Sequence, residues 1–143
     1  PVVGYRGGGP ALTDTIAGHT TAMVEPVPSA IPHVRAGRLR VLAVTSPKRA
    51  SSLPDVPTVA ESGLPGFALP SWYALWGPAK LPADVTQTLF EATQRALKAP
   101  ATKEKLAGMA FETIAGSPQE LNEVMRLETA KYAAIVKQAN IKV

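Results

Sequence analysis

The chain has 143 residues, of which 45% are hydrophobic, and its 15 basic and 11 acidic residues give a net charge of +4. This size and composition predict a compact globular chain with its own core and exclude disorder. The lack of cysteine excludes disulfides and thiolate metal sites, the dispersed basic residues argue against a nucleic-acid partner, and no apolar run is long enough to span a membrane.

The first predicted elements surround a glycine-rich turn. Residues 1–5 are expected to end a strand, Gly7 to Gly9 to form the turn, and residues 10–17 to form a short helix. Pro10 suits the first helical position, and Gly18 suits the residue after the helix end.

The start of this helix is a candidate anion site. Free N–H groups of Gly9, Ala11 and Leu12 are expected to point out of its positive end, where carboxylates and phosphates bind. Arg6 beside the turn can form a bidentate pair with a carboxylate, or be simply solvated. The alternative is a tight connection with no ligand. The stretch lacks the lysine of a P-loop and the third glycine of a dinucleotide fingerprint, which disfavours phosphate transfer.

Helices and strands then alternate through the first third of the chain. A strand is expected over 19–24, a helix from Pro28 or Ser29 to Ala36 with Gly37 as its stop, and the clearest strand over 39–45. This order predicts an α/β fold with a mostly parallel sheet.

The rest of the chain is predicted to be mainly helical. A proline-rich stretch over 46–70 reads as a surface loop, followed by an aromatic strand over 71–76. Helices are expected over 83–98 and 101–109, and a small strand over 111–114. Ser117-Pro118-Gln119-Glu120 is a capping box that predicts the start of a long terminal helix.

No set of catalytic or metal-binding residues is apparent. His19 and His33 are isolated from each other, and Ser29 lacks the glycine elbow of a hydrolase nucleophile and is interpreted as a helix cap. Trp72, Tyr73 and Trp76 can line an apolar pocket or belong to the core. We therefore expect no cofactor and no catalytic residue.

Taken in order, several motifs resemble the solute-binding receptors of tripartite tricarboxylate transporters, also called the Bug family. The resemblance covers essentially the whole chain, and the run from Leu53 to Gly66 is particularly specific. It is carried by Tyr5-Arg6-Gly7-Gly8-Gly9-Pro10-Ala11, Asp14, Ala17-Gly18-His19, Pro28-Ser29-Ala30-Ile31-Pro32-His33, Ala36-Gly37, Leu42-Ala43-Val44-Thr45-Ser46, Leu53-Pro54-Asp55-Val56-Pro57-Thr58-Val59-Ala60-Glu61 and Gly63-Leu64-Pro65-Gly66.

The resemblance implies a receptor rather than an enzyme. Such receptors are periplasmic, have a two-lobe α/β fold of the periplasmic-binding-protein type (type II), and deliver a small organic acid to membrane permease subunits. It implies ligand-binding roles for Gly8, Gly9 and Ala11, with Arg6 and Thr13 behind them. An enzyme acting on a small anionic substrate, or a non-binding interaction module, remains the alternative.

The resemblance also implies that the fold is only partly present. Family members are about twice as long, so residues 1–70 would belong to lobe two and residues 71–143 to the C-terminal part of lobe one. Helices that lack part of their sheet are expected to self-associate. Thr21 and Glu25-Pro26 stand where many members have aspartates, so the identity of the bound acid stays open.

Overall fold

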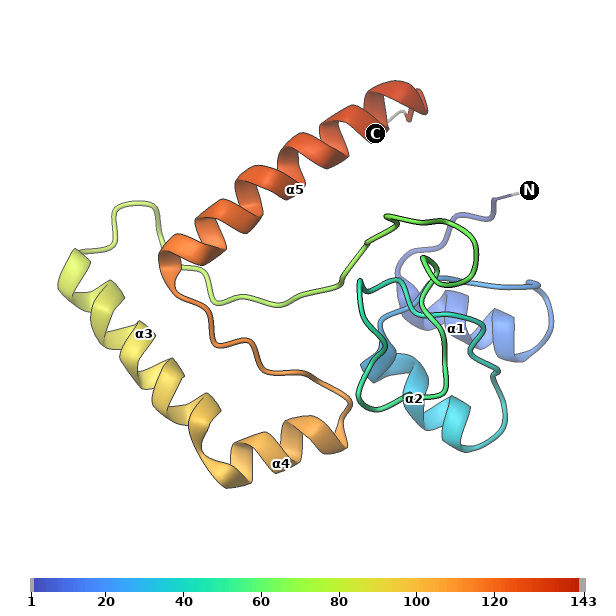
Figure 1. The fold of residues 1–143 in the computed structure, drawn as a ribbon, viewed down its shortest axis with the longest axis horizontal. Helices are drawn as coiled ribbons and strands as arrows, with labels where there is room; N and C mark the ends of the chain where they lie inside the picture. Colours follow the sequence, from blue (N-terminus) through green and yellow to red (C-terminus); the bar gives the residue numbers. More distant parts are fainter. Residues whose placement is uncertain (1, 142–143) are drawn as a thin grey trace. The chain divides into compact units, whose positions relative to one another are not determined.

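The computed structural model describes residues 2–141, which contain five helices (Figure 1). These helices are α1 (Gly8–Ile16), α2 (Val27–Arg35), α3 (Ala83–Lys98), α4 (Pro100–Gly108) and α5 (Pro118–Gln138). The chain divides into two compact units. Unit 1 runs to Trp72 and includes Lys103–Glu112, and unit 2 comprises Tyr73–Thr102 and the residues from Thr113 onward.

The predicted helices are confirmed, with small shifts at their ends. α1 begins at Gly8, two residues earlier than expected, and Gly18 and Gly37 follow α1 and α2 with positive φ angles of 79° and 68°. α3 has the predicted bounds, and α4 lies within one residue of them. Each of these helices forms from contacts close in sequence, so the local pattern is sufficient to locate them.

The capping box of α5 is present as predicted. The Oγ of Ser117 accepts a hydrogen bond from the N–H of Glu120 at 3.2 Å, and Glu120 Oε2 accepts one from the N–H of Ser117 at 2.6 Å. This backbone hydrogen bond lowers the pKa of Glu120. Two N–H groups at the helix start are thereby satisfied, which fixes the first residue of the longest helix.

The strand predictions for 2–5, 19–24, 71–76 and 111–114 are wrong for the described residues, where these segments are irregular. Of the 39–45 strand, only a parallel bridge between Val44 and Thr58 is formed. A helix satisfies its own backbone, whereas a strand needs a neighbouring strand to accept and donate its hydrogen bonds. Within residues 2–141 no second strand of sufficient length is available to pair with these segments.

The bridge at Val44 lies at the centre of unit 1. Val44 donates to the carbonyl of Pro57 and accepts from the N–H of Val59, both at 2.9 Å, while the carbonyl of Thr45 accepts from Leu69 at 2.8 Å. Successive residues of an extended chain direct their backbone groups to opposite edges. The 44–45 segment is therefore bordered on both edges, as expected of a central strand.

The core of unit 1 is small and drawn from several elements. Leu12 of α1, Ile31 of α2 and Val44 are its buried hydrophobic residues, and Thr58, which forms the parallel bridge with Val44, is also buried.

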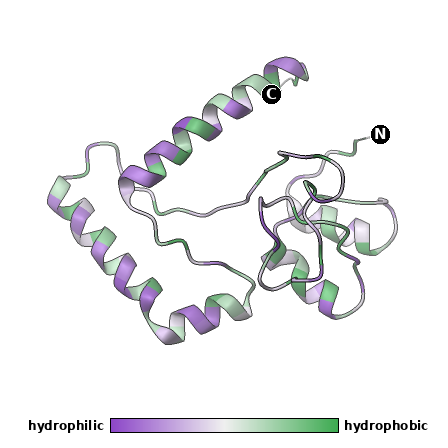
Figure 2. Ribbon diagram, viewed as in Figure 1, coloured by the Kyte–Doolittle hydropathy of each residue, from purple (hydrophilic) through white to green (hydrophobic). Residues whose placement is uncertain are grey.

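Unit 2 has amphipathic helices but buries none of their residues. Figure 2 shows hydrophobic and hydrophilic residues alternating along α3 and α5, and neither helix contains a buried residue. Its exposed large hydrophobic side chains include Tyr73, Leu75, Trp76, Val85, Leu89, Ile114, Val124, Leu127, Tyr132, Ile135, Val136 and Ile141. These faces have the pattern of helices that normally cover a sheet or another helix.

Candidate functional site

The glycine turn, defined here as Arg6 to Gly9, leads directly into α1. Gly7 is the N-cap residue, with φ 106° and ψ 172°, a conformation that is essentially restricted to glycine. Because α1 begins at Gly8 rather than Pro10, Pro10 is the third helical residue. The turn therefore places Gly8 and Gly9 themselves in the first turn of the helix.

The backbone donors at this helix start are fewer than the sequence predicted. The N–H groups of Gly8 and Gly9 have no acceptor within a helix that begins at Gly8, and Pro10 has no N–H. The N–H of Ala11 is within reach of the N-cap carbonyl, and that of Leu12 belongs to the helical ladder. Gly8 and Gly9 are thus the free donors of an exposed, positively polarised end.

The other predicted site residues lie around this end. Ala11 is half-buried, and Thr13 is exposed and donates from its hydroxyl to the carbonyl of Gly9 at 3.1 Å. Arg6 is exposed, and no ion pair to it is found within residues 2–141. The turn and the first helical turns therefore bring all five predicted residues into one short stretch of backbone.

Tyr5, which precedes the glycine turn, is hydrogen-bonded to Asp14 in α1. Its hydroxyl donates to Asp14 Oδ2 at 2.8 Å, and His19 Nδ1 lies 3.5 Å from Asp14 Oδ1. The hydrogen bond to Asp14 raises the pKa of Tyr5, and the bonds from Tyr5 and then His19 lower the pKa of Asp14. The aspartate thus joins the residues before and after the helix, which orients the turn relative to α1.

The carboxylate of Glu25 lies against the glycine turn, a position that the sequence analysis did not predict. A Cβ added to Gly8 would lie 2.7 and 2.8 Å from the two carboxylate oxygens of Glu25. Ser29 Oγ lies 2.6 Å from Glu25 Oε1 and 2.8 Å from the Pro26 carbonyl, so its single proton is shared between two acceptors. Ser29 is therefore not the helix cap that the sequence predicted; the N-cap of α2 is Pro26.

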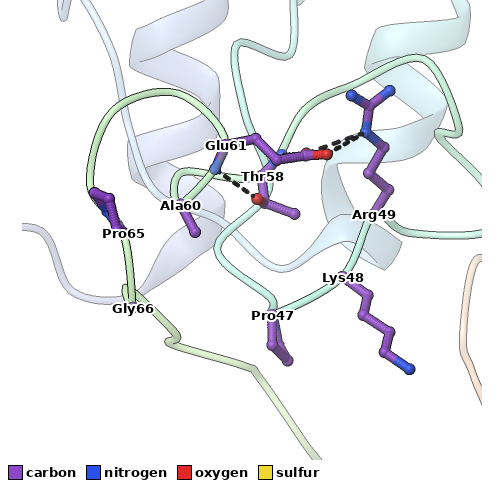
Figure 3. Close-up of a pocket in the computed structure, with 8 residues that line it drawn as sticks. All are labelled: Pro47, Lys48, Arg49, Thr58, Ala60, Glu61, Pro65 and Gly66. Atoms are coloured by element: carbon purple, nitrogen blue, oxygen red, sulfur yellow. Dashed lines mark hydrogen bonds and ion pairs between the residues drawn. The ribbon is translucent and has the colours of Figure 1, made fainter.

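A concave region of unit 1 is lined by residues other than those of the glycine turn (Figure 3). It is an open hollow of about 570 Å³ lined by Pro47, Lys48, Arg49, Thr58, Ala60, Glu61, Pro65 and Gly66. Figure 3 shows Arg49 directed toward Glu61, whereas Lys48 extends away from it. The acidic group of this hollow is already paired with its arginine, so we place the candidate site at the glycine turn.

The charged groups of this hollow stabilise a loop. Arg49 Nε donates to both carboxylate oxygens of Glu61 at 3.1 and 3.2 Å, and Arg49 also donates to the carbonyl of Pro54. Thr58 and Glu61 exchange backbone-to-side-chain hydrogen bonds at 2.7 and 3.0 Å. The bond from the Thr58 N–H, followed by that from Arg49, lowers the pKa of Glu61. This network fixes the turn that borders Val44.

Within 2–141 no three His, Asp or Glu side chains come together in a way that could hold a metal ion. Over the same residues no helix combines the length and apolarity needed to cross a bilayer. The chemistry available at the site is therefore hydrogen bonding by backbone N–H groups, with Arg6 and Glu25 as the nearby charges.

Comparison with known proteins gives consistent matches along the whole chain. The model of the tripartite tricarboxylate transporter family receptor matches residues 2–141. A UPF0065 protein of Agrobacterium vitis is 35% identical over 96% of this chain and 41% of its own length. BugT of Bordetella pertussis is 30% identical over 99% of this chain and 43% of its own length. The chain thus spans about two fifths of the length of these relatives.

Solved structures agree with the sequence matches. The R. palustris protein Rpa4515, solved with adipate, superposes with a TM-score of 0.88 and 32% identity over 97% of this chain and 46% of its own. The periplasmic binding protein BugD superposes with a TM-score of 0.78 and 26% sequence identity, over 96% of this chain and 47% of its own. These matches confirm the predicted fold class, a periplasmic-binding-protein fold that is only partly present in this chain.

Proposed function

Because the chain belongs to the tripartite tricarboxylate transporter receptor family, we propose that it is part of an extracytoplasmic receptor that captures a small organic acid and delivers it to membrane permease subunits. The observation that carries the proposal is the similarity, over 97% of the chain, to a protein solved with adipate. The proposed protein is periplasmic and acts by binding, not by catalysis.

The glycine turn supplies the proposed carboxylate contacts. Gly8 and Gly9 donate their free N–H groups, and Ala11 lies one helical position beyond Pro10, where its small side chain keeps the helix end open. Arg6 and Thr13 border the same end and add positive charge and a hydroxyl. The absence of a side chain at Gly8 and Gly9 lets a ligand approach the backbone directly.

These contacts account for only part of a receptor's affinity. An anion at a helix terminus gains about 0.3–1 kcal/mol, and about 2 kcal/mol in partly buried geometry. Micromolar binding requires about 8 kcal/mol. The remainder has to come from a second surface that encloses the acid, and we propose that residues 1–70 belong to lobe two and residues 71–143 to lobe one. The division of the chain at Trp72 supports this, although Lys103–Glu112 groups with the first unit.

Calorimetric titration of the full-length protein tests the proposal. The acids to be titrated are adipate, succinate, citrate, aspartate and benzoate. Binding without turnover is the expected result. Turnover of an acid would favour an enzyme. If none of the five acids binds, an interaction module is favoured.

Two glycine variants locate the site. Gly8→Val is expected to abolish binding, because its Cβ enters the space in front of the turn. Gly4→Val is the matched control, since a Cβ at Gly4 meets no atom within 4 Å. Unchanged affinity in Gly8→Val would show that the site lies elsewhere.

A further inference from the structure

The carboxylate of Glu25 lies at the place where an anionic ligand is expected to bind. Both of its oxygens are within 2.8 Å of the position of a Cβ on Gly8. An atom that close to the missing side chain stands directly over the first residue of α1. Glu25 therefore occupies the approach to the glycine turn that the proposed function assigns to a ligand.

The position of Glu25 follows from the start of α2. Glu25 precedes the N-cap residue Pro26, and the Ser29 hydroxyl, in the first turn of α2, donates to its Oε1. Neither α1 nor α2 has an acidic residue in its first turn or a side chain that caps it. Glu25 thus lies against the start of α1 and just ahead of α2, two helix starts that have no acidic residue of their own. Helix starts favour negative charge, so this position attracts the carboxylate.

We propose that Glu25 is a built-in competitor of the ligand, a carboxylate that an incoming organic acid must displace from Gly8. The inference rests on the proposed function, because it concerns the same turn. Two carboxylates cannot share the space over Gly8, since their like charges repel and their oxygens would overlap. A bound acid therefore requires Glu25 to rotate away from the turn.

Displacement determines affinity and selectivity together. When only a fraction of the molecules has Glu25 withdrawn, the apparent association constant for the acid is the intrinsic one multiplied by that fraction. Weak anions that offer one contact do not compensate for the loss of the Glu25 contacts, whereas an acid that also binds a second surface does. Glu25 is thus a specificity-determining residue that favours acids with more than one anchoring group over small inorganic anions.

Adipate titration of the full-length protein and four variants tests this role. Glu25→Gln weakens the attraction of the side chain to the helix ends, and Glu25→Asp retains the charge but is one methylene too short to stay over Gly8. Ser29→Ala removes the donor to Oε1. Glu104→Gln is the control, because it removes the same charge from an exposed position on α4.

The expected result is tighter adipate binding in all three site variants. A charge at one helix end contributes about 0.3–1 kcal/mol, so release from two ends corresponds to an increase of about three- to thirtyfold for Glu25→Gln. Ser29→Ala is expected to give a smaller gain, and Glu104→Gln none. Thermal unfolding of each variant shows whether the fold is retained. If Glu25→Gln does not fold, Glu25→Asp tests the proposal in its place.

Each opposite result has a distinct meaning. Adipate binding that is unchanged or weaker in Glu25→Gln would overturn the competitor role and leave the proposed function standing. A gain in Glu25→Gln without any gain in Glu25→Asp would also overturn it, since long-range charge repulsion would then be the cause. If neither the wild type nor any variant binds adipate or the other acids, the proposed function fails, and the inference fails with it.

Discussion

Alanine substitution at Gly7, Gly8 and Gly9 is expected to give three different results, because the structure assigns each glycine a different physical constraint. Gly7 has a φ of 106° and no neighbour within 4 Å of an added Cβ. Glycine is therefore required at this position by the backbone conformation and not by a lack of space. Holding alanine in this region costs about 1–3 kcal/mol, so Gly7→Ala is expected to destabilise the protein by that amount.

Gly8 and Gly9 have no positive φ angle and both lie in α1. A Cβ at Gly8 meets the end of the Glu25 side chain, which is able to rotate away, so the effect of Gly8→Ala on stability is expected to be small. Apart from its two chain neighbours and the backbone of α1, a Cβ at Gly9 meets nothing within 4 Å. Since alanine is favoured over glycine in a helix by up to about 1 kcal/mol, Gly9→Ala is expected to be neutral or stabilising.

Urea unfolding of the full-length variants measures these differences. With an m-value of about 2 kcal/mol per molar urea, a loss of 2 kcal/mol in Gly7→Ala lowers the midpoint by about 1 M. Gly8→Ala is expected close to the wild type, and Gly9→Ala at or above it. A midpoint in Gly9→Ala as low as that of Gly7→Ala would refute the reasoning, because it would mean that crowding rather than backbone conformation governs the turn.

Four further predictions concern other parts of the chain. Ser117→Ala removes the cap of α5 and is expected to cost about 0.5–2 kcal/mol in urea unfolding, with Ser117→Asp as the control that retains an acceptor. The lowered pKa of Glu120 means that its capping contribution is present above the ordinary glutamate range and is lost as the pH falls through the lower native value; Glu120→Gln should remove this acid dependence from the circular dichroism signal. Asp14→Asn is expected to bring the pKa of Tyr5 down toward its ordinary value, which alkaline ultraviolet titration measures, with Tyr5→Phe identifying the signal and an unmoved titration contradicting the hydrogen bond. Finally, the 143-residue chain alone is expected to self-associate and to bind adipate weakly, because α3 and α5 bury none of their residues; light scattering that finds a monodisperse monomer with micromolar affinity would contradict this.

The helices could be predicted from the sequence because their determinants are local. The box at Ser117 and Glu120 specifies the start of α5 within four residues, and the apolar spacing in residues 83–98 specifies α3. The strands could not be predicted in the same way, since a segment such as 19–24 with β-branched residues forms a strand only when another strand pairs with it. The 39–45 segment forms its bridge only where Pro57 and Val59 supply partners.

The candidate site was predictable only in part. The glycines and Pro10 indicated an open helix start, but its true beginning at Gly8 changed which N–H groups are free. The position of Glu25 could not be predicted, because it depends on how the starts of α1 and α2 approach each other. The one available signal was the order Glu25-Pro26-Val27-Pro28-Ser29, which places an acid just ahead of a helix whose first turn contains none.

The parallel bridge between Val44 and Thr58 also has a consequence for the order of folding. It closes a loop of only fourteen positions, whereas the hydrogen bond from Ser51 to Glu112 joins residues 61 positions apart. The entropy of loop closure grows with the logarithm of loop length, so the longer closure costs about 1.3 kcal/mol more. Contacts of short sequence separation also form faster. The 44–58 loop is therefore expected to close first during refolding, before Glu112 arrives at Ser51, so amide protons at Val44 and Val59 should acquire protection from exchange earlier than the one at Ser51.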